Sequence, residues 1–231
     1  MTLTVDVISD VICPWCYIGK RRLEKAIAAH AGRGDVRVRW HPFQLNPQMP
    51  KAGVNRREYH TAKFGSWERS LALDAQVAAA GRAEGIPFAH DKIERTPNTL
   101  DAHRLIWLAE KEGVQNAVVE ALFRAYFTEG RDISHTPTLL DVVAGAGLER
   151  ERAEAVLGSD EGLAAIRAAE EEAHRAGVQG VPFSVINSTI TLSGAMEASA
   201  FLDAFDWAGA ETPTASEGSV CKIGAGGAAS C

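Results

Sequence analysis

Two cysteines separated by two residues, Cys13-Pro14-Trp15-Cys16, constrain this chain more than any other feature. An alternating apolar run at residues 3–8 precedes the pair and predicts a strand, and a helical pattern at residues 17–31 follows it. Cys13 is therefore expected at a strand-to-helix junction, with its sulfur at the N-terminus of the helix. Pro14 suits the first helical turn, because its missing N–H would be unpaired there anyway.

The chemistry of this pair follows from its position. The N-terminus of a helix stabilises an anion such as a thiolate by about 0.3–1 kcal/mol. The spacing also lets the two sulfurs close a small disulfide ring, with Cys16 buried in the first turn and Cys13 at the mouth of the site. The pattern therefore predicts a redox dithiol in which Cys13 attacks and Cys16 resolves. A structural disulfide and half of a zinc site are the alternatives.

Composition, net charge and the N-terminal sequence limit the classes of protein to which this chain can belong. With 231 residues, 46% of them hydrophobic, the chain can bury a large core and carry an insertion or a tail. Its net charge of −6 argues against nucleic acid and anionic membrane surfaces as partners. No stretch is long and apolar enough to span a bilayer. The N-terminus enters a strand without a basic region or a cleavage site, so we expect a cytoplasmic, reducing location.

The order of the remaining elements predicts the domain organisation. Val36, Val38 and Trp40 alternate with polar residues and indicate a second strand, parallel to the first through a right-handed crossover. The pattern from residue 55 to about residue 177 is helical, and its acidic run at residues 170–172 is expected to be a solvated helix face. A hairpin at residues 183–192 and a helix at about residues 197–207 follow. We expect an α/β domain (residues 1–50 and 178–209) with an inserted helical subdomain (residues 51–177).

Residues 210–231 have a different composition, rich in Gly, Ala, Ser and Thr, and are predicted to be a flexible C-terminal tail. Cys221 and Cys231 lie in this tail with nine residues between them. They are candidate accessory thiols that exchange with the active-site pair. The alternative is that they are incidental thiols.

Several stretches in a fixed order resemble the DsbA family of thioredoxin-like oxidoreductases, most closely its cytoplasmic FrnE-like branch. They span about residues 3–207 and read Asp10-Val11-Ile12-Cys13-Pro14-Trp15-Cys16, Phe43-Gln44-Leu45-Asn46-Pro47, Lys63-Phe64-Gly65, Asn98-Thr99 with Ala102-His103-Arg104-Leu105, and Gly180-Val181-Pro182-Phe183. The resemblance implies a thioredoxin-like fold with an inserted all-helical subdomain and a thiol–disulfide oxidoreductase or isomerase without cofactor or metal. Its partner would be a disulfide-containing protein or a low-molecular-weight thiol.

The same resemblance implies roles for residues outside the dithiol. It implies a cis Val181–Pro182 peptide that sets the Val181 backbone beside Cys13, where a substrate strand can pair with it; the simpler alternative is that Pro182 starts a strand. Trp15 has no core to fill, so we expect an exposed ring that touches substrate, beside Pro14. Asn98 is first a candidate helix cap, and the resemblance suggests that it also faces the cleft.

Two further residues are candidate accessory groups. Asp10, three residues before Cys13, is placed to accept or relay the Cys16 proton, or to cap the loop before the helix. His103 lies on a largely apolar helix and is either a buried core histidine or part of the site.

The sequence also allows two other classes of function. The 2-hydroxychromene-2-carboxylate isomerases and kappa-class transferases, which use glutathione, share the layout but resemble Ser-x-x-Ser at this position, and the two cysteines here count against them. A thioredoxin-like module that only holds clients is a third possibility, and the intact dithiol argues against it.

Overall fold

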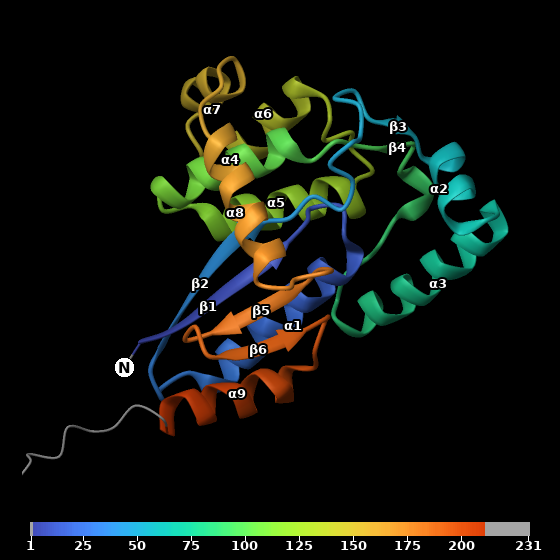
Figure 1. The fold of residues 1–231 in the computed structure, drawn as a ribbon. Coiled ribbons are helices and arrows are strands. Elements are labelled where there is room, and N and C mark those ends of the chain that lie inside the picture. Colours follow the sequence, from blue (N-terminus) through green and yellow to red (C-terminus); the bar gives the residue numbers. More distant parts are fainter. Residues whose placement is uncertain (1, 211–231) are drawn as a thin grey trace, which may run out of the picture.

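A four-stranded mixed sheet with the order β2–β1–β5–β6 organises the computed structural model, which describes residues 2–210 (Figure 1). β1 and β2 are parallel along their whole length, from Thr2 opposite Asp35 to Ser9 opposite Pro42. β5 runs antiparallel to both of its neighbours. The strands are β1 Thr2–Ser9, β2 Asp35–Pro42, β5 Phe183–Ile186 and β6 Ile190–Ser193.

The predicted β-α-β unit is confirmed. Helix α1 (Pro14–His30) connects the two parallel strands and begins with proline in its first turn. Helix α9 (Ala198–Ala210) packs against α1 and against β1, β5 and β6. Its buried Phe201 and Phe205 join the hydrophobic core that also contains residues of α1 and the sheet.

The predicted hairpin is also confirmed. Asn187 and Ser188 both have positive φ, 46° and 60°, which is the backbone of the tight turns whose twist matches that of the flanking strands. The Asn187 side chain accepts a hydrogen bond from the backbone N–H of Thr4 at 2.9 Å. This bond ties the turn to β1, so the turn fixes the register of the hairpin and its place in the sheet.

Between β2 and β5 the chain forms the expected helical insertion, with one difference. Two short antiparallel strands, β3 (Val54–Asn55) and β4 (Arg95–Thr96), pair within it, so the insertion is predominantly rather than entirely helical. Gly53 allows this pairing, because a Cβ at that position would lie 2.6 Å from the carbonyl oxygen of Thr96. The helices are α2 Arg56–Phe64, α3 Trp67–Ala83, α4 Leu100–Lys111, α5 Gln115–Phe127, α6 Thr136–Gly145, α7 Arg150–Leu157 and α8 Leu163–Arg175, with a 3-10 turn at His90–Lys92.

The insertion is fastened to the sheet at β2, against which α4, α5 and α8 all pack. The Gln115 side chain accepts from the backbone N–H of Trp40 at 3.0 Å and donates to its carbonyl at 2.9 Å. Gln115 therefore satisfies the backbone N–H and carbonyl of one residue, Trp40, at the open edge of β2. Figure 1 shows α4, α5 and α8 gathered over this end of the sheet, while α2 and α3 project to one side. Across residues 2–210, every helix is too short or too polar to cross a lipid bilayer.

Candidate active site

The dithiol lies where β1 gives way to α1, as its spacing predicts. After β1 ends at Ser9, a turn brings the backbone N–H of Cys13 to the carbonyl of Asp10 at 3.0 Å. Cys13 is the N-cap residue of α1, with an extended backbone (φ −91°, ψ 111°) and no side-chain cap hydrogen bond. Its sulfur therefore lies at the positive end of the helix dipole without capping the helix.

The two thiols have different surroundings. Cys16 is 1% exposed, and burial raises the pKa of its thiol well above the ordinary value. The neighbouring Cys13 raises this pKa further, while hydrogen bonds from the Ser9 hydroxyl and the Asp10 backbone oppose the shift. Cys16 thus holds its proton until a nearby base or a change at Cys13 removes it, which suits a resolving thiol.

Cys13 is less open than the sequence suggests. It is 5% exposed, and its Sγ lies 3.5 Å from the carbonyl oxygen of Val181, to which the thiol donates. Residues 13 and 181 are far apart in the sequence, so only the fold brings them together. The Val181 carbonyl therefore covers part of the Cys13 sulfur.

The Val181–Pro182 peptide bond is cis, as the resemblance implies. Pro182 is buried against Gly19 of α1, where a Cβ would lie 3.2 Å from its ring carbon Cγ. Gly19 therefore permits the close approach of the loop to the dithiol helix, a role that sequence reasoning missed. A hollow of about 370 Å³ lies along the same loop, lined by Gly177, Gln179, Gly180, Val181, Pro182, Phe183, Ser193 and Gly194.

The two residues between the cysteines face outward to different extents. Trp15 is 41% exposed, in agreement with the expected exposed ring, and Pro14 is half-buried. The entrance to the site is therefore apolar on the side of α1.

Two buried polar side chains, Asp10 and His103, lie next to each other. Asp10 is completely buried, and its Oδ2 accepts the backbone N–H of Leu45 at 2.8 Å. His103 of α4 is 3% exposed, and its Nε2 lies 3.4 Å from Asp10 Oδ1 without satisfying hydrogen-bond geometry. The structure thus brings the two predicted accessory residues together.

Glu170 of α8 belongs to the same group, and sequence reasoning missed it. The acidic run was expected to be solvated throughout, but Glu170 is half-buried and its Oε1 accepts the backbone N–H of Gln44 at 2.8 Å. Burial raises the pKa of Glu170; Asp10 adds to this, whereas the Gln44 N–H and His103 oppose it. The available signal was helical spacing, because Glu170 shares the inner face of α8 with the buried Ile166 and Ala173.

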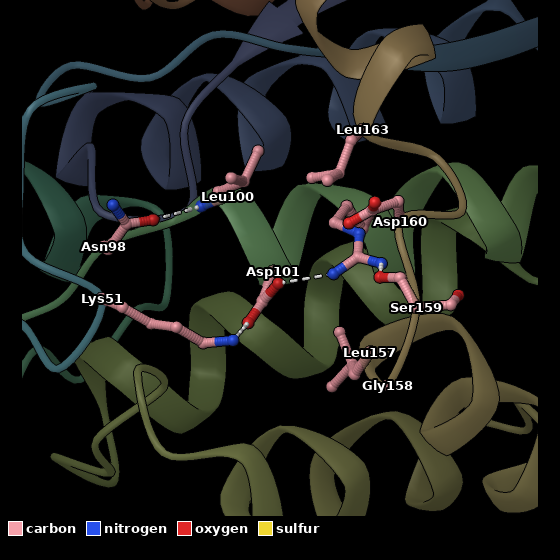
Figure 2. Close-up of a pocket in the computed structure, with 10 residues that line it drawn as sticks. Lys51, Asn98, Leu100, Asp101, Leu157, Gly158, Ser159, Asp160 and Leu163 are labelled. Atoms are coloured by element: carbon pink, nitrogen blue, oxygen red, sulfur yellow. Dashed lines mark hydrogen bonds and ion pairs between the residues drawn. The ribbon is translucent and has the colours of Figure 1, made fainter.

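The side-chain amide of Asn98 bonds to two backbone segments of the protein. Thr99, not Asn98, is the N-cap residue of α4. The Asn98 Oδ1 accepts the backbone N–H of Leu100, the first residue of α4, at 2.9 Å, and its Nδ2 donates to the carbonyl of Met49 in the loop after β2 at 2.6 Å. Figure 2 shows Asn98 at the edge of a cavity of about 500 Å³ between α4 and the loop from α7 to α8. Neither cysteine of the dithiol lines this cavity.

The charges around this cavity are largely paired with one another. Lys51 Nζ lies 3.2 Å from Asp101 Oδ2, and Arg104 Nη1 donates to Asp101 Oδ1 at 2.9 Å (Figure 2). Arg104 also donates to the carbonyl oxygens of Val156, Ser159 and Glu161. Arg104 therefore stabilises the loop between α7 and α8.

Across residues 2–210, no cluster of three or more His, Cys, Asp or Glu side chains could hold a metal ion. Cys221 and Cys231, the predicted accessory thiols, lie outside the described residues.

Known proteins are similar to this chain in sequence and fold. The chain is 34% identical to a probable DsbA oxidoreductase, SCO1869, from Streptomyces coelicolor, with a TM-score of 0.84 over 99% of each chain. It is 25% identical to the uncharacterized protein YwbO of Bacillus subtilis over 82% of this chain and 90% of that protein. It shares the fold of the cytosolic disulfide reductase DsbM from Pseudomonas aeruginosa with GSH, at 22% identity and a TM-score of 0.58, over 89% and 96% of the two chains.

A family model described as the DSBA-like thioredoxin domain matches residues 4–206. That match includes the dithiol, the cis-proline loop and the whole helical insertion. Together with the strand order and the position of Cys13, it shows that this chain belongs to the DSBA-like thioredoxin family.

Proposed function

We propose that this protein is a thiol–disulfide oxidoreductase or isomerase that acts on a disulfide-containing protein or on the disulfide of a low-molecular-weight thiol. One observation carries the proposal. The Cys13 sulfur lies at the N-terminus of α1, beside the Val181 carbonyl, with a second, more deeply buried thiol one helical turn further on. This is the geometry of a nucleophile and its resolving partner.

The proposed reaction has two exchange steps. The Cys13 thiolate attacks one sulfur of the substrate disulfide, which forms a mixed disulfide and releases the first substrate thiolate. Cys16 then loses its proton and attacks the Cys13 sulfur, which closes the Cys13–Cys16 disulfide and releases the second substrate thiolate. The substrate gains two electrons and the dithiol loses two. An external thiol returns the pair to the reduced state.

Substrate recognition is assigned to the mouth of the site. The backbone of Val181 offers its carbonyl next to Cys13, and an extended peptide pairs with such a backbone edge. The exposed Trp15 ring, with the half-buried Pro14, provides apolar surface around it. A direct substrate contact by Asn98 stays a prediction, since both ends of its amide are engaged in the protein.

We place this activity in a reducing compartment such as the cytoplasm. A chain with four cysteines, two of them in a redox pair, has no disulfide framework to build. The cytosolic reductase with the same fold supports this placement.

An insulin-reduction assay with an external dithiol tests the proposal. We expect the wild-type protein to accelerate the precipitation of insulin chains and Cys13→Ser to be inactive. The alternative, a glutathione-dependent isomerase or transferase, is tested with a 2-hydroxychromene-2-carboxylate substrate and glutathione. Isomerisation by the protein without any disulfide reduction would overturn the proposal in favour of that alternative.

A further inference from the structure

β2 is an edge strand of the sheet, and Gln115 closes one end of its open edge. The backbone N–H and carbonyl of Trp40 point away from β1 and bond to the Gln115 side chain. In a parallel pair, backbone groups two residues apart on one strand point in the same direction, so those of Val36 and Val38 also face the open edge. Among residues 2–210, no other group bonds to them as Gln115 bonds to Trp40.

An apolar groove runs along the same edge. It has a volume of about 400 Å³ and lies between α1 and β2, lined mainly by Leu23, Ile27, Val36, Val38 and Trp40. Ile27, Val36 and Val38 are only half-buried. An open strand edge beside apolar surface pairs readily with further chain, and folded proteins usually cover such an edge. The groove and the open backbone groups together fit an extended segment that carries apolar side chains on one face.

Helix α9 ends beside the start of this groove. Arg33 Nη1 donates to Asp206 Oδ1 at 3.0 Å, and the rings of His30 and Phe205 have centroids 5.3 Å apart. His30 ends α1, and Arg33 lies in the short connection from α1 to β2. Figure 1 shows the end of α9 near the start of β2. The chain beyond α9 therefore continues from the end of the groove at which β2 begins.

The sequence beyond α9 contains one stretch that suits the groove. The branched apolar residues of residues 211–231 lie in Val220-Cys221-Lys222-Ile223, and Val and Ile favour strands. Cys221 and Ile223 are two residues apart, so they fall on one face of an extended chain. Cys221 lies 11 residues beyond Ala210, a length that reaches at most about 36–40 Å, whereas residues 36–40 of β2 span about 13 Å. The stretch can therefore reach the whole groove.

We propose that residues 220–223 add to the open edge of β2 as a short parallel strand, with Cys221 in the groove beside Val36 and Ile223 beside Val38. The parallel direction follows from the connection, because the chain approaches from the end at which β2 begins. The backbone of the segment bonds to the two open positions of β2, and its apolar pair covers the half-buried side chains there. The inference goes beyond the proposed function and does not depend on it.

Docking in this position separates Cys221 from the dithiol. Val36 lies opposite Leu3, and β1 runs six residues further, to Ser9, before the turn that carries Cys13. Six strand residues correspond to about 20 Å. A docked Cys221 is therefore too far from Cys13 to exchange with it, so the predicted accessory role of Cys221 requires release of the segment from the groove.

Amide hydrogen exchange of the full-length protein, followed residue by residue by NMR, tests the docking. We expect the Val36 and Val38 amides to exchange at least about tenfold more slowly in the wild type than in Ile223→Asp, which places a charge in the groove. Val220→Asp is the matched control, because it adds the same charge to the same segment on the face away from the groove. We expect Val220→Asp to keep the wild-type exchange rates within about twofold.

A second measurement changes the groove and follows the thiols of the segment. Ile27→Asp should make Cys221 react with N-ethylmaleimide at least about tenfold faster than in the wild type, whereas the rate at Cys231 should change by less than about twofold. Leu71→Asp is the control, because Leu71 is an apolar residue of α3 that is 48% exposed and lies outside the groove. Peptide mass spectrometry locates the modification, and thermal unfolding verifies that each variant is folded.

Equal exchange rates of Val36 and Val38 in the wild type and in Ile223→Asp would overturn the inference. Equal effects of Ile223→Asp and Val220→Asp, or a larger effect of Val220→Asp, would overturn it as well. Protection that rises with protein concentration, together with a dimer in size-exclusion chromatography and no effect of Ile223→Asp, would show that a second copy of the chain covers the edge instead. Neither measurement uses disulfide reduction, so a failure of the proposed function would leave this inference in place.

Discussion

The two sides of the dithiol differ in chemistry. The mouth, formed by Pro14, Trp15 and the Val181–Pro182 loop, is apolar and partly exposed. The back, formed by Asp10 and His103 with Glu170 behind them, is polar, largely buried and built from a turn, α4 and α8. The mouth is contributed by the sheet domain alone, while the back needs the helical insertion.

Under the proposed function, we expect the two sides to act differently in the exchange. The apolar surface of the mouth, with the Val181 backbone, is accessible to a polypeptide substrate. Asp10 and His103 are buried and cannot touch a substrate. Variants on the mouth should therefore change substrate capture, and variants at the back should leave it nearly unchanged.

The largest effect is expected when the two cysteines are substituted one at a time. Cys13→Ser should lower disulfide reduction by at least about 1,000-fold, because the attacking sulfur is gone. Cys16→Ser should instead accumulate a mixed disulfide between Cys13 and the substrate, because nothing resolves it. Non-reducing gels and intact-mass measurements distinguish the two outcomes. Trapping through Cys16 in Cys13→Ser would reverse the assignment.

A smaller effect is expected at the mouth. Trp15→Ala should raise KM for a protein disulfide about 5- to 30-fold, which corresponds to about 1–2 kcal/mol of lost apolar contact, and should leave kcat nearly unchanged. Trp207→Ala is the matched control, because Trp207 is also an exposed tryptophan, at 61%, but lies on α9. Equal effects of the two substitutions would show that Trp15 is not a substrate contact.

The smallest effect is expected at the cavity that Asn98 lines. Lys51→Ala removes one partner of Asp101, whose other partner, Arg104, stays in place. Since Lys51 is exposed and the dithiol does not line this cavity, we expect protein-disulfide turnover within about twofold of wild type and unfolding free energy within about 0.5 kcal/mol. A more than tenfold loss of turnover would show that this cavity is part of the substrate site and that substrate contacts extend beyond the mouth.

The mouth could be predicted from the sequence because its signals are local. A strand pattern, Cys-Pro-Trp-Cys and a helix pattern follow one another along the chain, and each fixes the position of the next. The parallel β-α-β unit and the hairpin are likewise encoded by alternation and by short turns such as Asn187-Ser188. The Val181–Pro182 loop is distant from Cys13 in the sequence, and only the family resemblance connected them.

The back could be predicted only in part. Asp10 and His103 were candidates one at a time, but their contact depends on where α4 packs. Glu170 was misjudged because charge patterning was given more weight than its position between Ile166 and Ala173 on the inner face of α8. The short β3–β4 pairing was missed because strands of two residues have no periodicity to detect.

Alkylation of the reduced protein tests most directly whether Cys13 is the attacking thiol and Cys16 the buried resolving one. A limiting amount of iodoacetamide is added at several pH values from 5 to 9, and peptide mass spectrometry locates the modification. Because burial raises the pKa of Cys16, we predict that Cys13 alone is modified at pH 6–7 and that Cys16 stays unmodified. Modification of Cys16 first, or of both cysteines at the same rate, would contradict this assignment.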